Sequence, residues 1–515
     1  MTFKTIRHEP RLPYCGLTII LSNPSRFDTR ELLSGNSGAW FLEKLKTAAA
    51  GRILRFHCDI RTSNCRVPLL PNTRVVLCLG EIAQQEWFSN GHTLKEQRGS
   101  PYLSPDGIIY LSSFLPIDAH DFQPHEQRLN PQFRGANDFD DEEDDGEAKG
   151  TKGATRRGNF KFWLEQDTIK SIRLLRTGVN RGAGCDVRLN TPASTLVSVL
   201  QEQSGSEIFL DIETTFTRTL TCIGFAFPNS PVYVFPIRRY NYTTLYSTRE
   251  FAQIWKALGT ALRRNMCVTH NGAGFDWLVL AHHYRLPFGR SLYDTMISMN
   301  RLWPEAEKSL GHVMSLLTDE PYHKDEGVFN PHNAEQEEQL MRYNAKDVHA
   351  LRLLKVAFDR EAAADAGLAA SITQGQDMIY PYMVAALRGI RCDETRLNTL
   401  VAVNDRYMTQ LLRIAKILVG PENYAALQGK SAAGLLTSGK QAARYFYDVM
   451  GYKCPRKTDS GEDSTDAKAL LKLAIALAKS GTQNPLIPLR MKFAEVAKET
   501  SMLSNLNLWP EKAYL

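Results

Sequence analysis

The chain has 515 residues, of which 43% are hydrophobic and 23% are charged, with a net charge of +6. The hydrophobic fraction is typical of a soluble globular protein, and the length predicts about three domains. No apolar stretch reaches the roughly 18 residues of a membrane-spanning helix, and the start of the chain lacks the apolar segment of a signal peptide. The nine cysteines include no CxxC pair, which argues for reduced thiols in a cytoplasmic compartment and against a zinc module.

Residues 14 to 120 alternate between predicted strands and helices. LTIILSNPS is typical of a strand running into a turn, SGAWFLEKLKTAA of a helix, and RVVLCLGEIAQQEW of a strand, a tight glycine and a helix. Such alternation predicts an α/β layer with a mostly parallel sheet. The segment NFKFWLEQDTIKSIRLL adds a closing amphipathic helix. We therefore assign residues 1–185 to a first α/β domain.

An acidic run interrupts this first domain. Residues 138–147, DFDDEEDDGE, contain eight acids and no base, so the rest of the chain is more basic than the net charge suggests. That surplus favours a polyanionic partner. We predict a disordered acidic loop over about 125–158. A sharper hypothesis is that this loop mimics nucleic acid and covers a basic groove until DNA displaces it.

The motif order of the first domain resembles the uracil-DNA glycosylase superfamily: strand-NPS, GxSG before a helix, LCLGxxA, and LKEQRG before a hydrophobic strand. That family has a water-activating Asp or Asn in its first loop and a His-Pro-Ser motif after a late strand. This chain has Ser22 to Ser25 in the first place and Ser112 to Pro116 in the second. His120 and His125 lie downstream, but nothing in the sequence places them in a pocket. The resemblance implies a glycosylase-like fold kept for DNA or protein contact, with an active glycosylase as the alternative.

Residues 186–362 predict a second α/β domain. Three strands at hairpin spacing, 207–212, 220–227 and 232–237, precede a capping box of Ser247 and Glu250 that starts the helix FAQIWKALGTAL. A buried strand, a helix and two further helices complete the region. This order predicts a mixed sheet with helices on both faces.

Three separated blocks of the second domain carry acids and one tyrosine. In IFLDIETT, Asp211 and Glu213 alternate with apolar residues, so both carboxylates point to the same face of a strand. In MRYNAKDVHA, Tyr343 and Asp347 stand four residues apart in a helical pattern, one turn above the other. Asp276 follows a short apolar strand and a glycine-containing turn that should open a helix.

Carboxylates gathered from different elements predict a metal centre. They repel one another and hold protons unless divalent cations neutralise them. Hard oxygen ligands in this number suit Mg²⁺ or Mn²⁺ rather than zinc. Two such ions, roughly 3.5 to 4 Å apart, can polarise a phosphodiester, activate a water and stabilise the leaving oxygen. The predicted reaction is the hydrolysis of nucleic acid.

The order DxE, NxxxFD and YxxxD resembles the exonuclease motifs of the DEDD superfamily, tyrosine subclass, which includes the proofreading domain of family A DNA polymerases and RNase D-like enzymes. The resemblance implies a ribonuclease H-like fold and a two-metal 3′-to-5′ exonuclease. It implies that Asp211 bridges both ions, that Glu213 and Asp347 complete the first site, and that Asp276 holds the second ion mostly through water. Tyr343 would orient the attacking water, because a phenol with a pKa near 10 is a poor base at neutral pH.

The same resemblance indicates contacts to the terminal nucleotide from Thr214, His270, Asn271 and Phe275. Phe275 is as readily a core residue, and His270 can simply cap a turn. Asp294, in LYDTM, also recurs in the family. An acid in a turn at the end of a strand is the simpler interpretation, and Asp294 stays outside the predicted catalytic set.

From about residue 363 to 515 the sequence predicts an all-α region. DMIYPYMVAALRGIRCDETRL resembles the segment after the proofreading domain of family A polymerases, and LTSGKQAARYFYDVMGYKCPRKTDSGEDSTDAKALLKLA resembles their thumb. This resemblance makes five residues candidates for holding backbone phosphates, with ordinary surface roles as the alternative: Lys430, Lys440, Arg456, Lys457 and Thr458. No palm or fingers sequence follows, so we expect a separate chain that carries them, or a truncated polymerase.

The sequence thus predicts a multidomain α/β protein with 3′-to-5′ exodeoxyribonuclease activity that serves a replicative polymerase. It would act on single-stranded DNA and primer-template 3′ ends with two Mg²⁺ or Mn²⁺ ions. The alternative is a non-catalytic subunit that holds DNA and recruits a separate palm and fingers chain. Fusion of these parts suggests a bacteriophage and hence a bacterial host cytoplasm, with no membrane partner. DNA and RNA stay open as substrates, since both contain the scissile phosphodiester.

Overall fold

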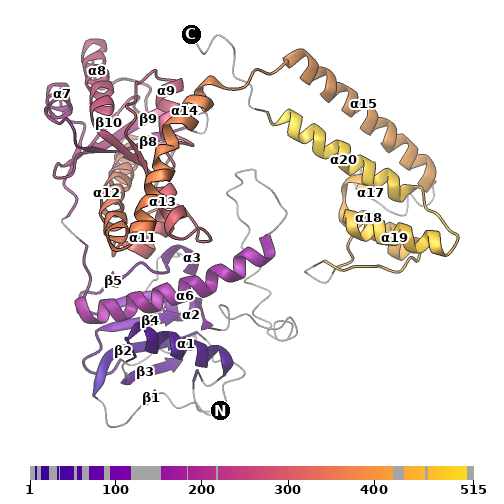
Figure 1. Cartoon of the computed structure of the whole chain (residues 1–515), viewed down its shortest axis with the longest axis horizontal. Helices are drawn as coiled ribbons and strands as arrows, with labels where there is room; N and C mark the ends of the chain where they lie inside the picture. Colours follow the sequence, from indigo (N-terminus) through magenta and orange to yellow (C-terminus); the bar gives the residue numbers. More distant parts are fainter. Residues whose placement is uncertain are drawn as a thin grey trace. The chain divides into compact units, whose positions relative to one another are not determined.

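The computed structural model describes residues 6–7, 13–22, 32–33, 35–51, 55–60, 69–85, 93–116, 152–181, 184–215, 219–420, 434–458 and 462–506. The chain divides into two compact units, Met1–Leu387 and Arg388–Leu515 (Figure 1). The first unit contains two six-stranded sheets, each with its own core. Among the described residues, no helix is both long enough and apolar enough to cross a membrane.

The first sheet is mostly parallel, as predicted. In the order β1-β3-β2-β4-β6-β5, the four central strands run parallel, and β1 and β5 pair antiparallel at the edges. The strands are β1 (Ile6–Arg7), β2 (Tyr14–Leu21), β3 (Arg55–Ile60), β4 (Val75–Leu79), β5 (Tyr102–Leu103) and β6 (Ile109–Ser113). Central parallel strands are buried on both faces, which explains their continuous apolar runs.

Helices cover the first sheet, and the last of them starts earlier in the sequence than predicted. Leu17, Leu77 and Leu164 belong to the core between sheet and helices. The helix that contains Leu164 starts at Lys152, so the end of the acidic loop predicted over 125–158 is helical instead. Residues 125–151 lie outside the described residues. The helices are α1 (Asn36–Ala48), α2 (Glu81–Gln84), α3 (Leu94–Gln97) and α6 (Lys152–Thr177).

The second sheet is mixed, as predicted, with the order β12-β11-β8-β9-β10-β7. Strands β8, β9 and β10 form an antiparallel meander, β11 and β12 extend it in parallel from β8, and β7 pairs in parallel with β10. The strands are β7 (Val187–Leu189), β8 (Glu207–Thr214), β9 (Leu220–Ala226), β10 (Val232–Pro236), β11 (Met266–Thr269) and β12 (Leu292–Asp294).

Helices pack on both faces of the second sheet (Figure 1). Ile208, Leu210 and Ile212 of β8 face one helical layer, and Phe209 faces the other. Alternate residues of a strand point to opposite faces, so Asp211 shares the face of Phe209. The first layer is α7 (Ala193–Glu202), α8 (Thr248–Arg264), α9 (Asp276–His282) and α14 (Ile379–Arg388); the second is α12 (Ala334–Ala364) and α13 (Ala366–Asp377), with α10 (Thr295–Leu302) and α11 (Leu310–Leu317) beside it.

The predicted boundary after residue 362 falls inside helix α12. Ile372, Ile379 and Met383 follow that boundary and still pack into the cores of the second sheet. The second unit begins only at Arg388. Helical periodicity shows that a face is buried but not which core buries it, so the sequence could not fix this boundary.

The second unit consists of helices with one short β-bridge between Lys457 and Asp463. Leu411, Tyr445 and Phe493 contribute to its own core. The all-α prediction for this region therefore holds among the described residues apart from that bridge. The elements are α15 (Glu394–Val419), α17 (Gly434–Thr437), α18 (Gly439–Ala443), the π-helical η2 (Arg444–Val449), α19 (Ala467–Lys479) and α20 (Leu486–Ser504).

Candidate active site

Three carboxylates converge where α12 crosses the middle of the second sheet. Asp211 and Glu213 extend from β8 and Asp347 from α12, and one oxygen atom of each lies within 4.8 Å of the other two. Glu213 and Asp347 are buried. The strand and helix patterns in the sequence predicted this arrangement, since period-two spacing pairs the two acids of β8 on the face that α12 covers.

A glycine allows α12 to come this close to the sheet. Gly224 of β9 pairs with Asp211 of β8. A Cβ atom on Gly224 would lie 2.0 Å from Asn344 Oδ1 and 2.9 Å from Val348 Cγ2, both on α12. Any larger residue would therefore displace the Asn344 and Val348 side chains, or the helix that carries them and Asp347.

Asn344 orients the first acid of the cluster. Its Nδ2 donates a 2.6 Å hydrogen bond to Asp211 Oδ2, and its side chain is fully buried. Sequence reasoning missed Asn344, although residues three apart on a helix share a face and Asn344 stands three before Asp347.

The cluster favours a bound cation because its acids ionise poorly without one. Burial raises the pKa of Asp211 well above its usual range, and Asp347, Asp276 and Glu213 raise it further. Burial, followed by the charge of Asp347, raises the pKa of Glu213 to about 8. The carboxylate oxygens lie close together, and they hold protons when no positive charge compensates them. Such a group of oxygens is suited to binding a hard divalent cation.

Asp276 adjoins the cluster without belonging to its group of three. It is the first residue of α9, as the sequence predicts, and its Oδ1 accepts a 3.2 Å hydrogen bond from the Ile212 amide of β8. Burial raises the pKa of Asp276 to about 7. The acid is therefore held against the strand that carries Asp211 and Glu213.

Asp294 stabilises the turn that leads to Asp276. Its Oδ1 accepts from the amides of Asn271 and Met296, both at 2.9 Å, and its Oδ2 accepts from the amide of Ala273 at 3.4 Å. Asn271 has a φ of 60°, a left-handed conformation that few residues other than glycine adopt. The structure thus supports the simpler interpretation, in which Asp294 is a turn and cap residue.

The four residues predicted to contact a terminal nucleotide lie in different environments. Thr214 is half-buried at the end of β8, and the Asn271 side chain is exposed. Phe275 packs against the hydrophobic core to which α8 and α9 contribute, which agrees with the interpretation of Phe275 as a core residue. His270 Nδ1 lies 2.8 Å from Thr295 Oγ1, and burial lowers the pKa of His270 to about 4. Asn271 is therefore the most accessible of the four.

Tyr343 lies one turn before Asp347 on α12 and is 4% exposed. Its ring centroid is 5.6 Å from that of Phe329 and 6.0 Å from that of His323. Burial, followed by the charges of the carboxylate cluster, raises the pKa of Tyr343 well above its usual range. The phenol therefore keeps its proton at neutral pH and can donate a hydrogen bond, but it cannot act as a base.

Two residues that sequence reasoning missed bind Asp347 directly. His323 Nε2 lies 2.8 Å from Asp347 Oδ1, and Lys324 Nζ donates to Asp347 Oδ2 at 2.7 Å. Burial pushes the pKa of Asp347 upward, but Lys324 and His323 outweigh that effect and hold it below its usual value. Both residues lie in the connection between α11 and α12, where no periodic pattern could have indicated them.

The predicted phosphate-binding residues all belong to the second unit, and Lys430 lies outside the described residues. Lys440 is exposed in α18. Arg456 forms a 2.9 Å ion pair with Asp466, and Lys457 forms one of 3.3 Å with Asp463. The Thr458 amide donates to the Glu462 carbonyl oxygen at 2.7 Å. Arg456, Lys457 and Thr458 thus each pair with a residue between 462 and 466.

Two serines at the glycosylase-like positions, Ser22 and Ser113, take part in structural hydrogen bonds. Ser22 Oγ accepts from the Ala83 amide at 2.9 Å. Ser113 Oγ donates to Asp167 Oδ2 at 2.6 Å, and Arg98 donates to both oxygens of Asp167 at 3.2 Å. Asn23 to Ser25, His120 and His125 lie outside the described residues.

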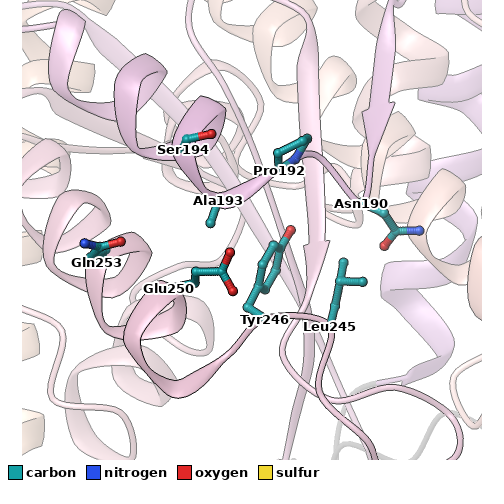
Figure 2. A pocket seen from close by; sticks show the side chains of 8 residues that line it. All are labelled: Asn190, Pro192, Ala193, Ser194, Leu245, Tyr246, Glu250 and Gln253. Atoms are coloured by element: carbon teal, nitrogen blue, oxygen red, sulfur yellow. The ribbon is translucent and has the colours of Figure 1, made fainter.

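A separate pocket of about 330 Å³ lies beside the first turns of α7 and α8 (Figure 2). Two of its polar groups have partners: Tyr246 donates from its hydroxyl to the Thr191 carbonyl at 2.8 Å, and Glu250 accepts from the Ser247 amide at 2.9 Å in the predicted capping box. The pocket contains no residue of the carboxylate cluster. The lining residues are Asn190, Pro192, Ala193, Ser194, Leu245, Tyr246, Glu250 and Gln253.

Comparison with known proteins gives likenesses in structure only. No protein-family profile matches the chain, and no curated protein matches it in sequence. The POL domain of Pol1 from M. smegmatis, solved with a DNA primer-template and dNTP, aligns with 62% of this chain at 18% identity and a TM-score of 0.43, and this chain covers about half, 49%, of that one. Escherichia coli RNase D, an exoribonuclease involved in structured RNA processing, aligns over 63% of this chain and 94% of its own, at 16% identity and a TM-score of 0.32.

NrnC from Brucella melitensis, bound to pGG, aligns with 39% of this chain and 91% of its own, at 18% identity and a TM-score of 0.30. The similar structures thus include a polymerase domain and nucleases. All three TM-scores lie below 0.5, so the function proposed below is based on the residues of the site.

Proposed function

We propose that this protein is a metal-dependent 3′-to-5′ exonuclease that hydrolyses the terminal phosphodiester of DNA. The observation that carries the proposal is the convergence of Asp211, Glu213 and Asp347 within 4.8 Å in a buried setting. Bringing acids this close together in the folded protein costs free energy unless they bind a cation. The order of the motifs that contain them is that of the DEDD exonucleases, tyrosine subclass, with a ribonuclease H-like fold.

Asp211, Glu213 and Asp347 would hold divalent cations, Mg²⁺ or Mn²⁺, with Asp276 assisting through water. When bound, two such ions polarise the phosphodiester, activate a water and stabilise the leaving 3′ oxygen. Asn344 fixes the orientation of Asp211 through the 2.6 Å hydrogen bond from its amide. The raised pKa values of Asp211 and Glu213 mean that cation binding releases protons from the cluster.

Tyr343 would position the attacking water. Its phenol keeps its proton because burial and the neighbouring acids raise its pKa. A protonated hydroxyl donates a hydrogen bond and so restricts how a water can sit, which places that water in line with the scissile bond. Asn271, exposed at the turn before Asp276, would contact the terminal nucleotide, with its sequence neighbour His270 and with Thr214 at the end of β8 as further contacts.

A role in DNA replication follows from the same resemblance. The second unit would serve as a thumb, with Lys440, Arg456, Lys457 and Thr458 near the backbone of a primer-template. A palm and fingers chain of family A would be the partner, and a bacteriophage the source. The first α/β body would be a glycosylase-like fold without catalysis, a role supported by the use of Ser113 in the bond to Asp167.

The test is digestion of 5′-labelled single-stranded DNA with Mg²⁺. We expect a ladder of shortened products from the wild type and none from the Asp211→Ala, Glu213→Ala double variant. A ladder that persists in the double variant would contradict the proposal. A matched RNA strand determines whether RNA is also degraded, and uracil-containing DNA without added metal tests the glycosylase alternative, which predicts abasic sites.

A further inference from the structure

Lys324 places a positive charge inside the proposed active site. Its Nζ lies 2.7 Å from Asp347 Oδ2 and 4.4 Å from the centroid of the Tyr343 ring. His323 Nε2 lies 2.8 Å from the other oxygen of Asp347. Both carboxylate oxygens of Asp347 are therefore engaged by neighbouring residues of one connection, 318–333, between α11 and α12.

The ammonium group acts on the whole cluster and not only on its hydrogen-bond partner. Its charge favours the ionised forms of Asp211, Glu213 and Asp347 alike. The Lys324 side chain is 26% exposed and that of Asp347 only 4%, so the pair lies where water screens charge weakly. Lys324 thus provides part of the charge compensation that buried acids require.

The connection that carries Lys324 is anchored just before it by helix α6 of the first α/β body. Lys170 Nζ donates to the carbonyl oxygens of Ser315 and Thr318, the former at 2.7 Å. Arg173 Nη1 donates to Asp319 Oδ2 at 3.0 Å, and Asp319 is 3% exposed. These contacts fix the backbone that leads to Lys324. The position of the Lys324 ammonium beside Asp347 therefore depends on the packing of α6 against this connection.

We propose that Lys324 is an internal counter-ion of the metal site, which holds Asp347 in place in the metal-free protein and yields it to divalent cations when they bind. This inference rests on the proposed function. Lysine suits the task because its ammonium is a compact charge on a flexible stem, and it can move off while the anchored backbone stays in place. A positive charge this close also opposes the binding of a second cation.

Two substitutions in the full-length chain therefore have opposite expected effects on Mn²⁺ affinity. Lys324→Gln removes the competing charge, so calorimetric titration should give an Mn²⁺ Kd lowered on the order of tenfold. Lys324→Arg offers Asp347 a bidentate guanidinium, which grips a carboxylate more firmly, so the Kd should rise by roughly several-fold. The control is Lys346→Gln, which breaks an exposed ion pair with Glu326 and should leave the Kd unchanged.

Thermal unfolding adds a measurement that does not depend on catalysis. In EDTA, Lys324→Gln should have a lower Tm than the wild type, and saturating Mn²⁺ should remove most of this difference. An unchanged or higher Kd for Lys324→Gln, an unchanged or lower Kd for Lys324→Arg, or a Tm deficit that Mn²⁺ leaves intact would overturn the inference. If the wild type binds Mn²⁺ and one of these results is found, only the inference about Lys324 fails. If the wild type itself binds no Mn²⁺, the proposed function fails as well.

Discussion

Asn344 and Asp211 join helix α12 to strand β8 through a 2.6 Å hydrogen bond from the amide Nδ2 to the carboxylate Oδ2. This bond ties the direction of one acid of the cluster to the helix that carries another, Asp347. The geometry of the proposed metal site thus depends on how α12 packs against the sheet. Substitution of a residue in that contact therefore tests the site.

We expect Asn344→Ala to weaken Mn²⁺ binding and nuclease activity by roughly 10- to 100-fold, since partners that orient metal ligands typically contribute that much. Calorimetric titration with Mn²⁺ and the rate of DNA digestion measure the effect. The matched control is Gln253→Ala on the exposed side of α8. Wild-type Mn²⁺ affinity in Asn344→Ala would show that Asp211 needs no orienting partner.

We expect Gly224→Ala to destabilise the protein by about 1–3 kcal/mol, the usual cost of overpacking a close contact. The added methyl group would lie 2.0 Å from Asn344 Oδ1, so the Asn344 side chain that holds Asp211, or α12 itself, must shift. Urea unfolding gives the change in stability. Gly184→Ala is the control, because no atom lies within 4 Å of a Cβ atom placed there. Equal stability of the two variants would mean that α12 does not depend on this approach.

The local parts of the site could be predicted from the sequence, and the parts formed by long-range packing could not. The alternation around Asp211, the capping box of Ser247 and the helical spacing of Tyr343 and Asp347 are short-range patterns, and each forms where expected. Lys324 reaches Asp347 from a connection without periodicity, so its role emerges only once α11 and α12 are in place.

The first α/β body illustrates the same limit. Arg98 donates to Asp167 of α6 and also to Ser315 Oγ of α11, at 3.2 Å, and it lies 3.1 Å from His312 Nδ1. These residues come from segments far apart in the sequence, and no motif links them. Ser113, at the position where the glycosylase family has its His-Pro-Ser motif, joins this network through its bond to Asp167.

We expect Arg98→Met to destabilise the protein by about 3–5 kcal/mol, because it leaves the Asp167 carboxylate buried without its ionic partner. Arg98 and Asp167 are each 1% exposed. The double variant Arg98→Met, Asp167→Leu removes both charges and should recover much of the loss. Arg188→Met breaks the exposed pair with Asp186 and should change stability little. A double variant as unstable as Arg98→Met would contradict this explanation.

In the metal-free protein, the carboxylate cluster should contribute less stability as the pH rises. Glu213 and Asp276 have folded pKa values of about 8 and about 7, against ordinary values of 4.5 and 3.8. At these two carboxyls the folded state therefore binds more protons than the unfolded state across that window, so their contribution to the free energy of unfolding falls as pH increases through it. The Tm in EDTA, relative to that of a variant without the cluster carboxyls, should drop between about pH 5 and pH 8, and Mn²⁺ should oppose the drop.

The double variant Asp211→Asn, Glu213→Gln removes two carboxyls of the cluster whose pKa values burial raises. Its Tm in EDTA should vary less with pH than that of the wild type, and Mn²⁺ should no longer raise it. An identical pH profile for the two proteins would show that the cluster does not control this dependence.

The most direct test of the central claim is digestion of one single-stranded DNA, labelled in parallel at its 5′ end or at its 3′ end, with Mg²⁺. We predict that the 3′ label leaves first, as a mononucleotide, while the 5′-labelled strand shortens step by step. EDTA or Asp347→Asn should stop both, whereas Asp365→Asn at the exposed cap of α13 should not. Intact DNA under every condition, or release of the 5′ label first, would contradict the claim.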